Sequence, residues 1–117
     1  MKAKLKSYVR SYRRRWGLSQ SELAHLVGLK SGTTISRIER HIQKPTLLVA
    51  LACHAIFGIP PAELFPAVFV EIEEDVMRRA YGLYEQLQGS KSSATKTKLD
   101  CLEVALARAK ARNSKGL

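Results

Sequence analysis

The side chains best suited to binding a ligand lie between Lys30 and Lys44, where hydroxyls and cations recur at helical spacing. Arginine can form two hydrogen bonds with the O6 and N7 atoms of guanine, and short hydroxyls reach base edges or phosphate oxygens. A helix starting near Thr33 would place Arg37 on a polar face, opposite a pair of isoleucines. This arrangement would suit contacts to the bases or phosphates of a nucleic acid.

The two isoleucines define the orientation of this helix. Ile35 and Ile38 are three residues apart, so they lie on one helical face and anchor it to a core. Arg37 then extends from the exposed face, where we expect it to contact a base; contact with phosphate or solvent is the alternative. For Thr33 and Thr34, base or phosphate contact competes with capping of the helix N-terminus, and both interpretations stay open. The other expected contacts are to a base for Ser31 and to phosphates for Ser36, Lys30, Arg40 and Lys44.

The charge of the chain supports a polyanionic partner. Lysine and arginine number 20 against 10 aspartates and glutamates, which gives a net charge of +10 and a pI near 10.0. Residues 1–66 carry a net +8, whereas residues 67–117 carry a net +2. Basic charge near phosphates releases condensed counterions and adds affinity that does not depend on sequence. We therefore expect the polyanion to bind the first part of the chain; a cationic surface that only serves solubility is the alternative.

Five short helices are expected before Pro66, with no strand pattern between them. Ser19 and Glu22 form a Ser-x-x-Glu capping box, and Gly28 suits the end of the helix that the box starts. Thr46 can cap a later helix that ends at Gly58. The expected ranges are about 5–16, 20–27, 33–40, 47–57 and 62–65, and the side chains expected inward include Leu5, Tyr8, Val9, Tyr12, Trp16, Leu23, Ala24, Leu26, Val27, Leu47, Leu48, Leu51, Ala52, Ala55 and Ile56.

Two long helices are expected after Pro66, over about 67–88 and 94–112, joined by the polar loop 89–93. The second helix places its apolar residues at alternating four- and three-residue steps, a short heptad-like seam. Residues 113–117 are expected to fray. Both helices carry stripes too apolar to remain in water, so we expect a hairpin that a second copy of the chain completes. The predicted dimerisation residues are Phe69, Ile72, Val76, Leu83, Leu87, Leu99, Leu102 and Leu106.

Several classes of protein are disfavoured by what the sequence lacks. No apolar run approaches the roughly 18–20 residues of a membrane span, and no apolar core typical of a signal peptide follows the basic start. Cys53 and Cys101 are far apart, so two reduced and mostly buried thiols are expected, rather than a zinc site that includes His54. No P-loop, glycine-rich dinucleotide turn or nucleophile–base pair is recognisable. The sequence thus favours a cytoplasmic protein that is no enzyme and uses no metal or cofactor.

Three spaced motifs follow one another in the first part of the chain. They are Gly-Leu-Ser-Gln-Ser-Glu-Leu-Ala-His-Leu-Val-Gly at 17–28, Ile-Ser-Arg-Ile-Glu at 35–39 and Pro-Pro-Ala-Glu-Leu-Phe at 60–65. Together they resemble the helix-turn-helix of the phage-repressor, Cro-like (XRE) family. In physical terms, Ala24 allows two helices to cross closely and Gly28 allows a tight turn between them. The resemblance implies an all-α fold, with a five-helix lambda-repressor-like DNA-binding domain over 1–66 and a C-terminal two-helix hairpin over 67–117.

The resemblance also implies roles for individual residues. Gln20 matches the glutamine that starts the first motif helix and clamps a phosphate together with its backbone N–H. Arg13 and Glu39 match an arginine and a glutamate that pair and set the angle of the recognition helix. One departure is that Ile35 comes seven positions after the turn glycine, where the family usually has six. The stretch 30–32 is therefore one residue longer, which leaves the alignment of base contacts before the recognition helix open.

The expected function is a sequence-specific transcriptional regulator that binds double-stranded DNA, as a dimeric repressor on a palindromic operator. One alternative is the antitoxin of a toxin–antitoxin pair, which would bind its toxin through residues 67–117. Another is a protein-interaction or RNA-binding module that has this shape but no operator and discriminates weakly between specific and random duplex DNA. The expected partners are double-stranded DNA, a second copy of the chain and, through the hairpin, another protein.

Overall fold

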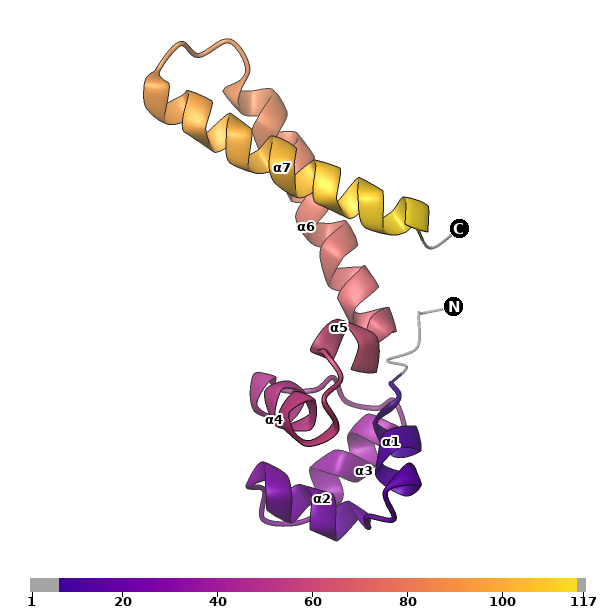
Figure 1. The fold of residues 1–117 in the computed structure, drawn as a ribbon. Helices are drawn as coiled ribbons and strands as arrows, with labels where there is room; N and C mark the ends of the chain where they lie inside the picture. Colours follow the sequence, from indigo (N-terminus) through magenta and orange to yellow (C-terminus); the bar gives the residue numbers. More distant parts are fainter. Residues whose placement is uncertain (1–6, 116–117) are drawn as a thin grey trace. The chain divides into compact units, whose positions relative to one another are not determined.

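The computed structural model describes residues 7–115, and every regular element in that range is an α-helix (Figure 1). The all-α fold predicted from the sequence is confirmed. The helices are α1 (Val9–Arg15), α2 (Gln20–Val27), α3 (Thr33–Glu39), α4 (Leu47–Phe57), α5 (Pro61–Leu64), α6 (Pro66–Leu87) and α7 (Ser93–Lys115).

The chain forms two compact units, and the division between them falls inside α6. The first unit ends at Val70 and the second begins at Glu71. The sequence placed this boundary at Pro66, where the composition changes. The structural division comes later because α6 runs through that point and its first turn belongs to the N-terminal core, in which Val68 is buried.

Local signals fix the ends of α2 and α4. The hydroxyl of Ser19 accepts a hydrogen bond from the backbone N–H of Glu22 at 3.0 Å, and the Glu22 carboxylate accepts one from the Ser19 N–H at 2.8 Å. This reciprocal capping box satisfies two N–H groups that have no partner within the helix. Gly28 ends α2 with φ of 100°, in the left-handed region that glycine adopts without steric cost. Thr46 caps α4 in a similar way, accepting from Val49 N–H at 3.2 Å.

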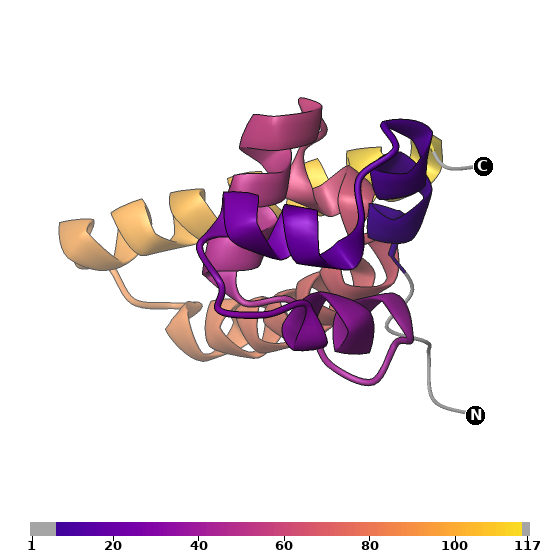
Figure 2. The ribbon, with the colours of Figure 1, turned by 90° about the horizontal axis from the view of Figure 1, so that it is seen from below.

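The core of the first unit takes at least one side chain from each of its five short helices. Figure 2 shows this unit from below, with α1, α2 and α3 on the side turned to the viewer. The ring of Tyr12 packs near that of Phe57, with the centroids 5.9 Å apart, which joins α1 to the end of α4. The buried apolar cluster consists of Val9, Leu23, Ala24, Val27, Ile35, Ile38, Val49, Cys53, Leu64, Phe65 and Val68.

The inward face predicted for α4 is wrong in part. Leu47, Leu48 and Leu51 were expected in the core but are 73, 53 and 51% exposed, and Ala55 is exposed too. Val49 and Cys53 occupy the core instead, at 0% exposure, while Ala52 and Ile56 are partly buried against it. The reason is that α4 is apolar all round, so its sequence contains no periodicity from which the buried face could be identified.

Two further apolar side chains lie outside the core against expectation. Trp16 at the C-cap of α1 is 69% exposed, and Leu26 on α2 is 54% exposed. On α2 the buried residues are Leu23, Ala24 and Val27, and Leu26 lies beyond the edge of this narrow face. Tyr8 is also open, at 40% exposure. The expected contribution of Leu5 falls outside the described residues.

The second unit is an antiparallel hairpin of α6 and α7. On α7 the predicted seam faces inward: Thr95 and Ala109 are buried, and the leucines between them are half-buried. On α6 the matching stripe includes the buried residues Glu73 and Ala80. The members of the two stripes follow heptad spacing, and they are Glu73, Met77, Ala80, Tyr84 and Leu87 on α6 and Thr95, Leu99, Leu102, Leu106 and Ala109 on α7.

Polar contacts tie the two hairpin helices together at two points along their length. Arg112 forms a salt bridge with the buried carboxylate of Glu73, and the hydroxyl of Tyr84 donates to Glu103 at 2.7 Å.

Helix α7 continues to Lys115, so the expected fraying over 113–115 is wrong, and residues 116–117 lie outside the described range. The expectation of two mostly buried thiols is also wrong in part, because Cys53 is buried whereas Cys101 is exposed. Over residues 7–115, no helix combines the length and the apolarity that a membrane crossing requires.

Candidate nucleic-acid interface

Gly32, at the N-cap of α3, packs tightly against the start of α2. A Cβ atom on Gly32 would lie 3.2 Å from both the backbone carbon and the Cβ of Gln20. Few real Cβ contacts are this tight, so a side chain at Gly32 would push the two helix starts apart. Sequence reasoning assigned a special role to Gly28 and missed this one, although Gly32 lies in the stretch that is one residue longer than usual. A glycine at this point allows the longer turn to close.

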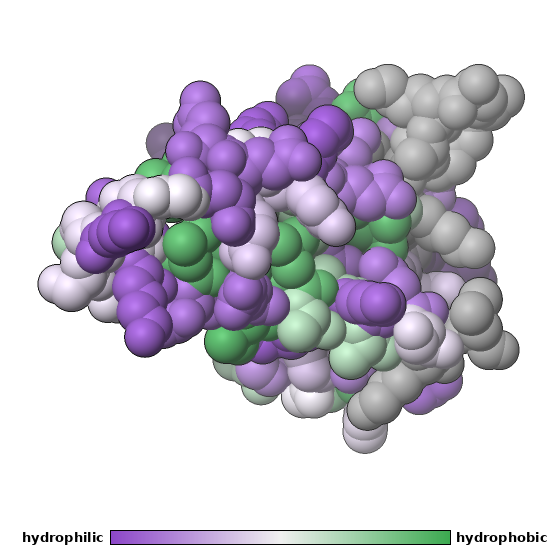
Figure 3. All heavy atoms as spheres, turned by 90° about the horizontal axis from the view of Figure 1, so that it is seen from above, coloured by the Kyte–Doolittle hydropathy of each residue, from purple (hydrophilic) through white to green (hydrophobic). Residues whose placement is uncertain are grey.

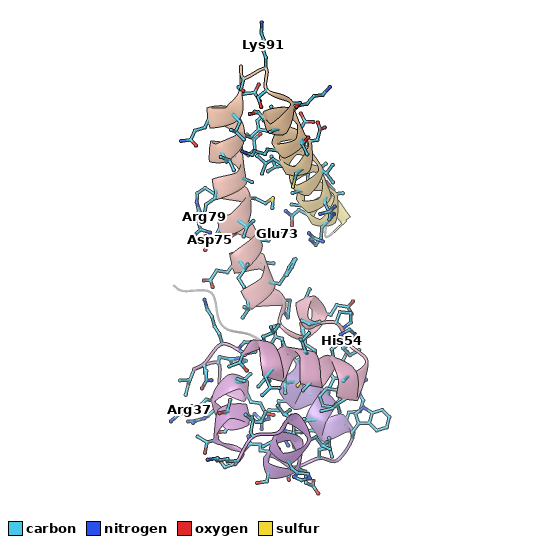
Figure 4. All side chains as sticks on the ribbon, turned by 90° about the vertical axis from the view of Figure 1, so that its left-hand side faces the viewer. Arg37, His54, Glu73, Asp75, Arg79 and Lys91 are labelled. Carbon is cyan, nitrogen blue, oxygen red and sulfur yellow. The ribbon has the colours of Figure 1, made fainter. Side chains whose placement is uncertain are left out.

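Helix α3 has a buried side and an exposed side, as the sequence indicated. Ile35 and Ile38 are each 1% exposed and hold the helix to the core. Thr33 and Arg37 are exposed on the other side, and in Figure 4 the side chain of Arg37 points outward from the unit. Of the other residues proposed as DNA contacts, Ser31, Lys30, Arg40 and Lys44 are exposed, while Thr34, Ser36 and Gln20 are half-buried.

The hydroxyls at the start of α3 bond to each other. Ser31 donates to the hydroxyl of Thr33 at 3.1 Å and accepts from the Thr33 backbone N–H at 3.4 Å. Ser31 thus accepts a hydrogen bond from one free N–H at the start of α3, whose N-cap is Gly32 and has no side-chain cap, so the capping considered for the threonines is not seen. Both hydroxyls are exposed and retain acceptor capacity for a group that approaches from outside.

The C-terminal end of α3 is a Schellman motif. The N–H of His41 donates to the carbonyl of Ile38 at 3.1 Å, and the N–H of Ile42 donates to that of Arg37 at 2.9 Å. His41 occupies the left-handed position of the motif with φ of 63°, where glycine is usual. The motif fixes the direction in which the chain leaves α3, toward the loop that carries Lys44.

One carboxylate joins three helices behind the exposed face. The guanidinium of Arg13 donates to both oxygens of Glu39, from Nε at 2.6 Å and from Nη2 at 2.9 Å. The side-chain amide of Gln20 donates to the same carboxylate at 3.0 Å. The structure thus brings Arg13 on α1, Gln20 on α2 and Glu39 on α3 together. The side chain of Glu39 is only 3% exposed, so these donors take the place of the water that would otherwise solvate its carboxylate.

The bond to Glu39 restricts what Gln20 can do. One amide proton of Gln20 is used inside the unit, which leaves its second amide proton and its backbone N–H for an outside acceptor. The sequence analysis missed this contact because no local pattern links residues 20 and 39. The role expected for Gln20 at a phosphate therefore concerns a side chain that is already oriented by the core.

The two cysteines and the histidines form no reactive arrangement with each other in the described part of the chain. Burial, with a smaller contribution from the nearby Glu39 carboxylate, raises the pKa of the Cys53 thiol to about 11. His25 and His54 are exposed. Within residues 7–115, no three His, Cys, Asp or Glu side chains lie close enough together to hold a metal ion.

The fold and this interface define the class to which the protein belongs. A family model described as helix-turn-helix matches residues 9–64, which cover α1 to α5. These residues form a helix-turn-helix domain of the XRE type, as the motifs predicted, and this domain supports a DNA-binding transcriptional regulator. No curated protein and no solved structure matches the chain.

Proposed function

We propose that the chain is a sequence-specific repressor that binds a palindromic operator as a homodimer, in the cytoplasm. The observation that carries this proposal is the two-sided build of α3. Arg37 extends outward while Ile35, Ile38 and Glu39 fix the opposite side. A rigidly held helix with an exposed arginine suits the major groove, where the edge of guanine accepts two hydrogen bonds from one guanidinium.

The proposed contacts divide into those that recognise bases and those that position the protein. Arg37 is the main base contact, and the exposed hydroxyls at the start of α3 flank it. Positioning contacts go to phosphates and carry no sequence information. Bases are contacted by Arg37, Thr33, Thr34 and Ser31, and phosphates by Gln20, Ser36, Lys30, Arg40 and Lys44.

The dimer proposal is supported by apolar side chains that the hairpin leaves open. Ile72, Val76 and Leu83 on α6 are 51, 45 and 44% exposed. Figure 3 shows apolar surface between hydrophilic side chains on the face seen from above. Leu87, Leu99, Leu102 and Leu106 are already half-buried within the hairpin, as is Phe69 in the first unit, so the three open residues are the centre of the proposed contact. A second hairpin packed there would complete a four-helix arrangement.

Selection of bound sites from random duplex DNA tests the proposal directly. We expect a palindrome whose half-sites are about 34 Å apart, one turn of DNA, because two recognition helices in a dimer enter successive major grooves. Footprinting on the selected site should protect both halves. Equal affinity for selected and random duplexes would contradict the proposal and would favour a module without an operator.

The antitoxin alternative is favoured by a second face of the hairpin. An open groove of about 670 Å³ lies between α6 and α7, and its lining includes Met77, Tyr81, Leu106 and Lys110. A toxin segment with an apolar stripe and an acidic group would fit it. Co-expression with any small reading frame next to this gene tests the idea: rescue of growth that is lost in Leu106→Arg supports an antitoxin, and a harmless or absent neighbour contradicts it.

A further inference from the structure

The first unit contains one long segment without charged side chains. Between Lys44 and Glu63 the sequence contains no Asp, Glu, Lys or Arg, although residues 1–66 carry a net +8. Helix α4 lies entirely within this region. A surface formed by α4 therefore differs from those formed by α1, α3 and the adjoining loops, over which the basic side chains are spread.

The outer side of α4 is an exposed apolar surface. Leu47, Leu51 and Ala55 are four residues apart, and Leu48 borders them. We refer to these four residues as the α4 outer face. Three of them are leucines that are more than half exposed, and Ala55 is exposed as well. A helix that is hydrophobic all round normally has both sides covered, so this face calls for a partner.

The α4 outer face lies away from the base-reading side chain. His54 is three residues after Leu51 and is exposed, so it marks this side of α4. In the view of Figure 4, His54 and Arg37 lie on opposite sides of the unit. A unit that inserts α3 into a major groove therefore keeps the α4 outer face available to a neighbour.

We propose that the α4 outer face binds the same face of a second copy of the chain. The charge distribution selects this occupant, because two units of net +8 repel each other wherever their basic surfaces meet. At the uncharged α4 outer face, two copies can touch without burying like charges. Binding to DNA adds to this effect, since phosphates neutralise the basic side of each unit.

The small size of the α4 outer face limits the strength of the contact between two copies. Stable interfaces bury about 800 Å² on each partner, far more than one side of a three-turn helix provides. The contact is therefore weak between free molecules. Two copies bound side by side on DNA have a high effective concentration for each other, and a weak contact is then sufficient. The α4 outer face thus couples repressor molecules on adjacent operators. This inference rests on the proposed function and goes beyond the proposed hairpin dimer.

The experiment compares binding of the full chain to one selected site and to two such sites in tandem. For the wild type we expect the second site to fill about tenfold more tightly than a single site, within the usual range of coupling between sites. Leu51→Lys should abolish this gain and leave single-site affinity unchanged. Leu26→Lys is the matched control, because it places the same charge at an equally exposed leucine on α2 and should keep the gain.

Two further measurements cover the cases in which Leu51→Lys is destabilised or no DNA site is selected. If Leu51→Lys melts at a lower temperature than the wild type, Leu47→Lys replaces it, since Leu47 is the most exposed leucine of the face. If no DNA site is selected, sedimentation of a concentrated sample at about 1 M salt, where charge repulsion is screened, should show weak association beyond the hairpin dimer that Leu51→Lys removes. Loss of the DNA site then counts against the proposed function alone. Equal tandem binding, or equal mass, of wild type and Leu51→Lys would show that the α4 outer face does not join two copies, and would overturn this inference.

Discussion

Arg13 on α1 and Glu39 at the end of α3 are joined by two parallel hydrogen bonds, with Nε to Oε2 at 2.6 Å and Nη2 to Oε1 at 2.9 Å. Both side chains are largely withdrawn from solvent, at 11 and 3% exposure. A bidentate pair of this kind fixes an angle as well as a distance. Since Gln20 bonds to the same carboxylate, the orientation of α3 relative to α1 and α2 depends on one buried charge.

Removing either partner of this pair should cost stability and DNA affinity together. Arg13→Ala leaves the Glu39 carboxylate buried without its cation, and such losses typically cost about 3–5 kcal/mol. A double-mutant cycle with Glu39→Ala, measured by denaturant unfolding, should show coupling of about 0.5–3 kcal/mol. Arg14→Ala, an exposed neighbour on α1, is the control and should change little. Strict additivity of the two single changes would mean that the pair does not act as a unit.

Substitution of Gly32 should weaken DNA binding through the spacing of two helices. In Gly32→Ala the new Cβ would meet Gln20 at 3.2 Å, so the starts of α2 and α3 must separate by a few tenths of an ångström. We expect a similar loss of affinity for every DNA sequence, measured on the selected site and on random duplex. Gly82→Ala is the matched control: nothing lies within 4 Å of its Cβ position, and alanine should stabilise α6 by up to about 1 kcal/mol. Unchanged binding by Gly32→Ala would show that the helix starts tolerate the shift.

Arg37 and Gln20 should differ in the kind of DNA binding they support. Arg37→Ala should relax the preference at one base position in each half-site, at a cost of about 1–3 kcal/mol on the preferred sequence. Gln20→Ala should weaken all sequences to a similar extent, because it loses a phosphate contact and an anchor to Glu39. Binding to a panel of single-base variants of the selected site separates the two patterns. A uniform loss in Arg37→Ala would reassign this residue to a phosphate.

The elements that the sequence predicted best are those set by local chemistry. The capping box at Ser19 and the glycine at position 28 define α2 at both ends, because their partners lie within one turn of the chain. The seam of α7 was identified for a similar reason, since a heptad repeat encodes its own buried side. Its members Thr95 and Ala109 are buried as the spacing required.

The features that the sequence did not predict depend on contacts distant along the chain. Helix α4 is apolar all round, so only packing against the other helices decides that Val49 and Cys53 are buried and Leu51 is not. The bond from Gln20 to Glu39 spans 19 residues, and the tight approach of Gly32 to Gln20 appears only once α2 and α3 pack. Resemblance suggested the partner of Arg13, but the third member of that cluster came from the structure.

The open stripe of α6 should control the oligomeric state. We expect the full chain to sediment as a dimer at micromolar concentration and Val76→Lys as a monomer, because the lysine charge would be buried between two hairpins. A chain that ends at Val70 should stay monomeric and bind a half-site weakly, since it keeps the whole core of the first unit, including Val68. Val104→Lys, at an equally open position on α7 away from this stripe, is the control. A full chain that remains monomeric at tens of micromolar would rule out the hairpin dimer.

The two cysteines should differ sharply in reactivity and in their effect on pH stability. Only the thiolate reacts with disulfide reagents, and burial raises the pKa of the Cys53 thiol to about 11, while Cys101 is exposed. At pH 8 we expect one thiol of the folded chain to be modified at once and the second only at the rate of unfolding; Cys101→Ser should remove the fast phase.

In the unfolded chain Cys53 ionises near pH 9, before it does in the folded chain. Its contribution to stability is therefore complete below pH 9 and is lost as the pH rises toward 11. The free energy of unfolding should fall more over this interval in the wild type than in Cys53→Ala, and rapid modification of both thiols in the folded chain would contradict the burial of Cys53.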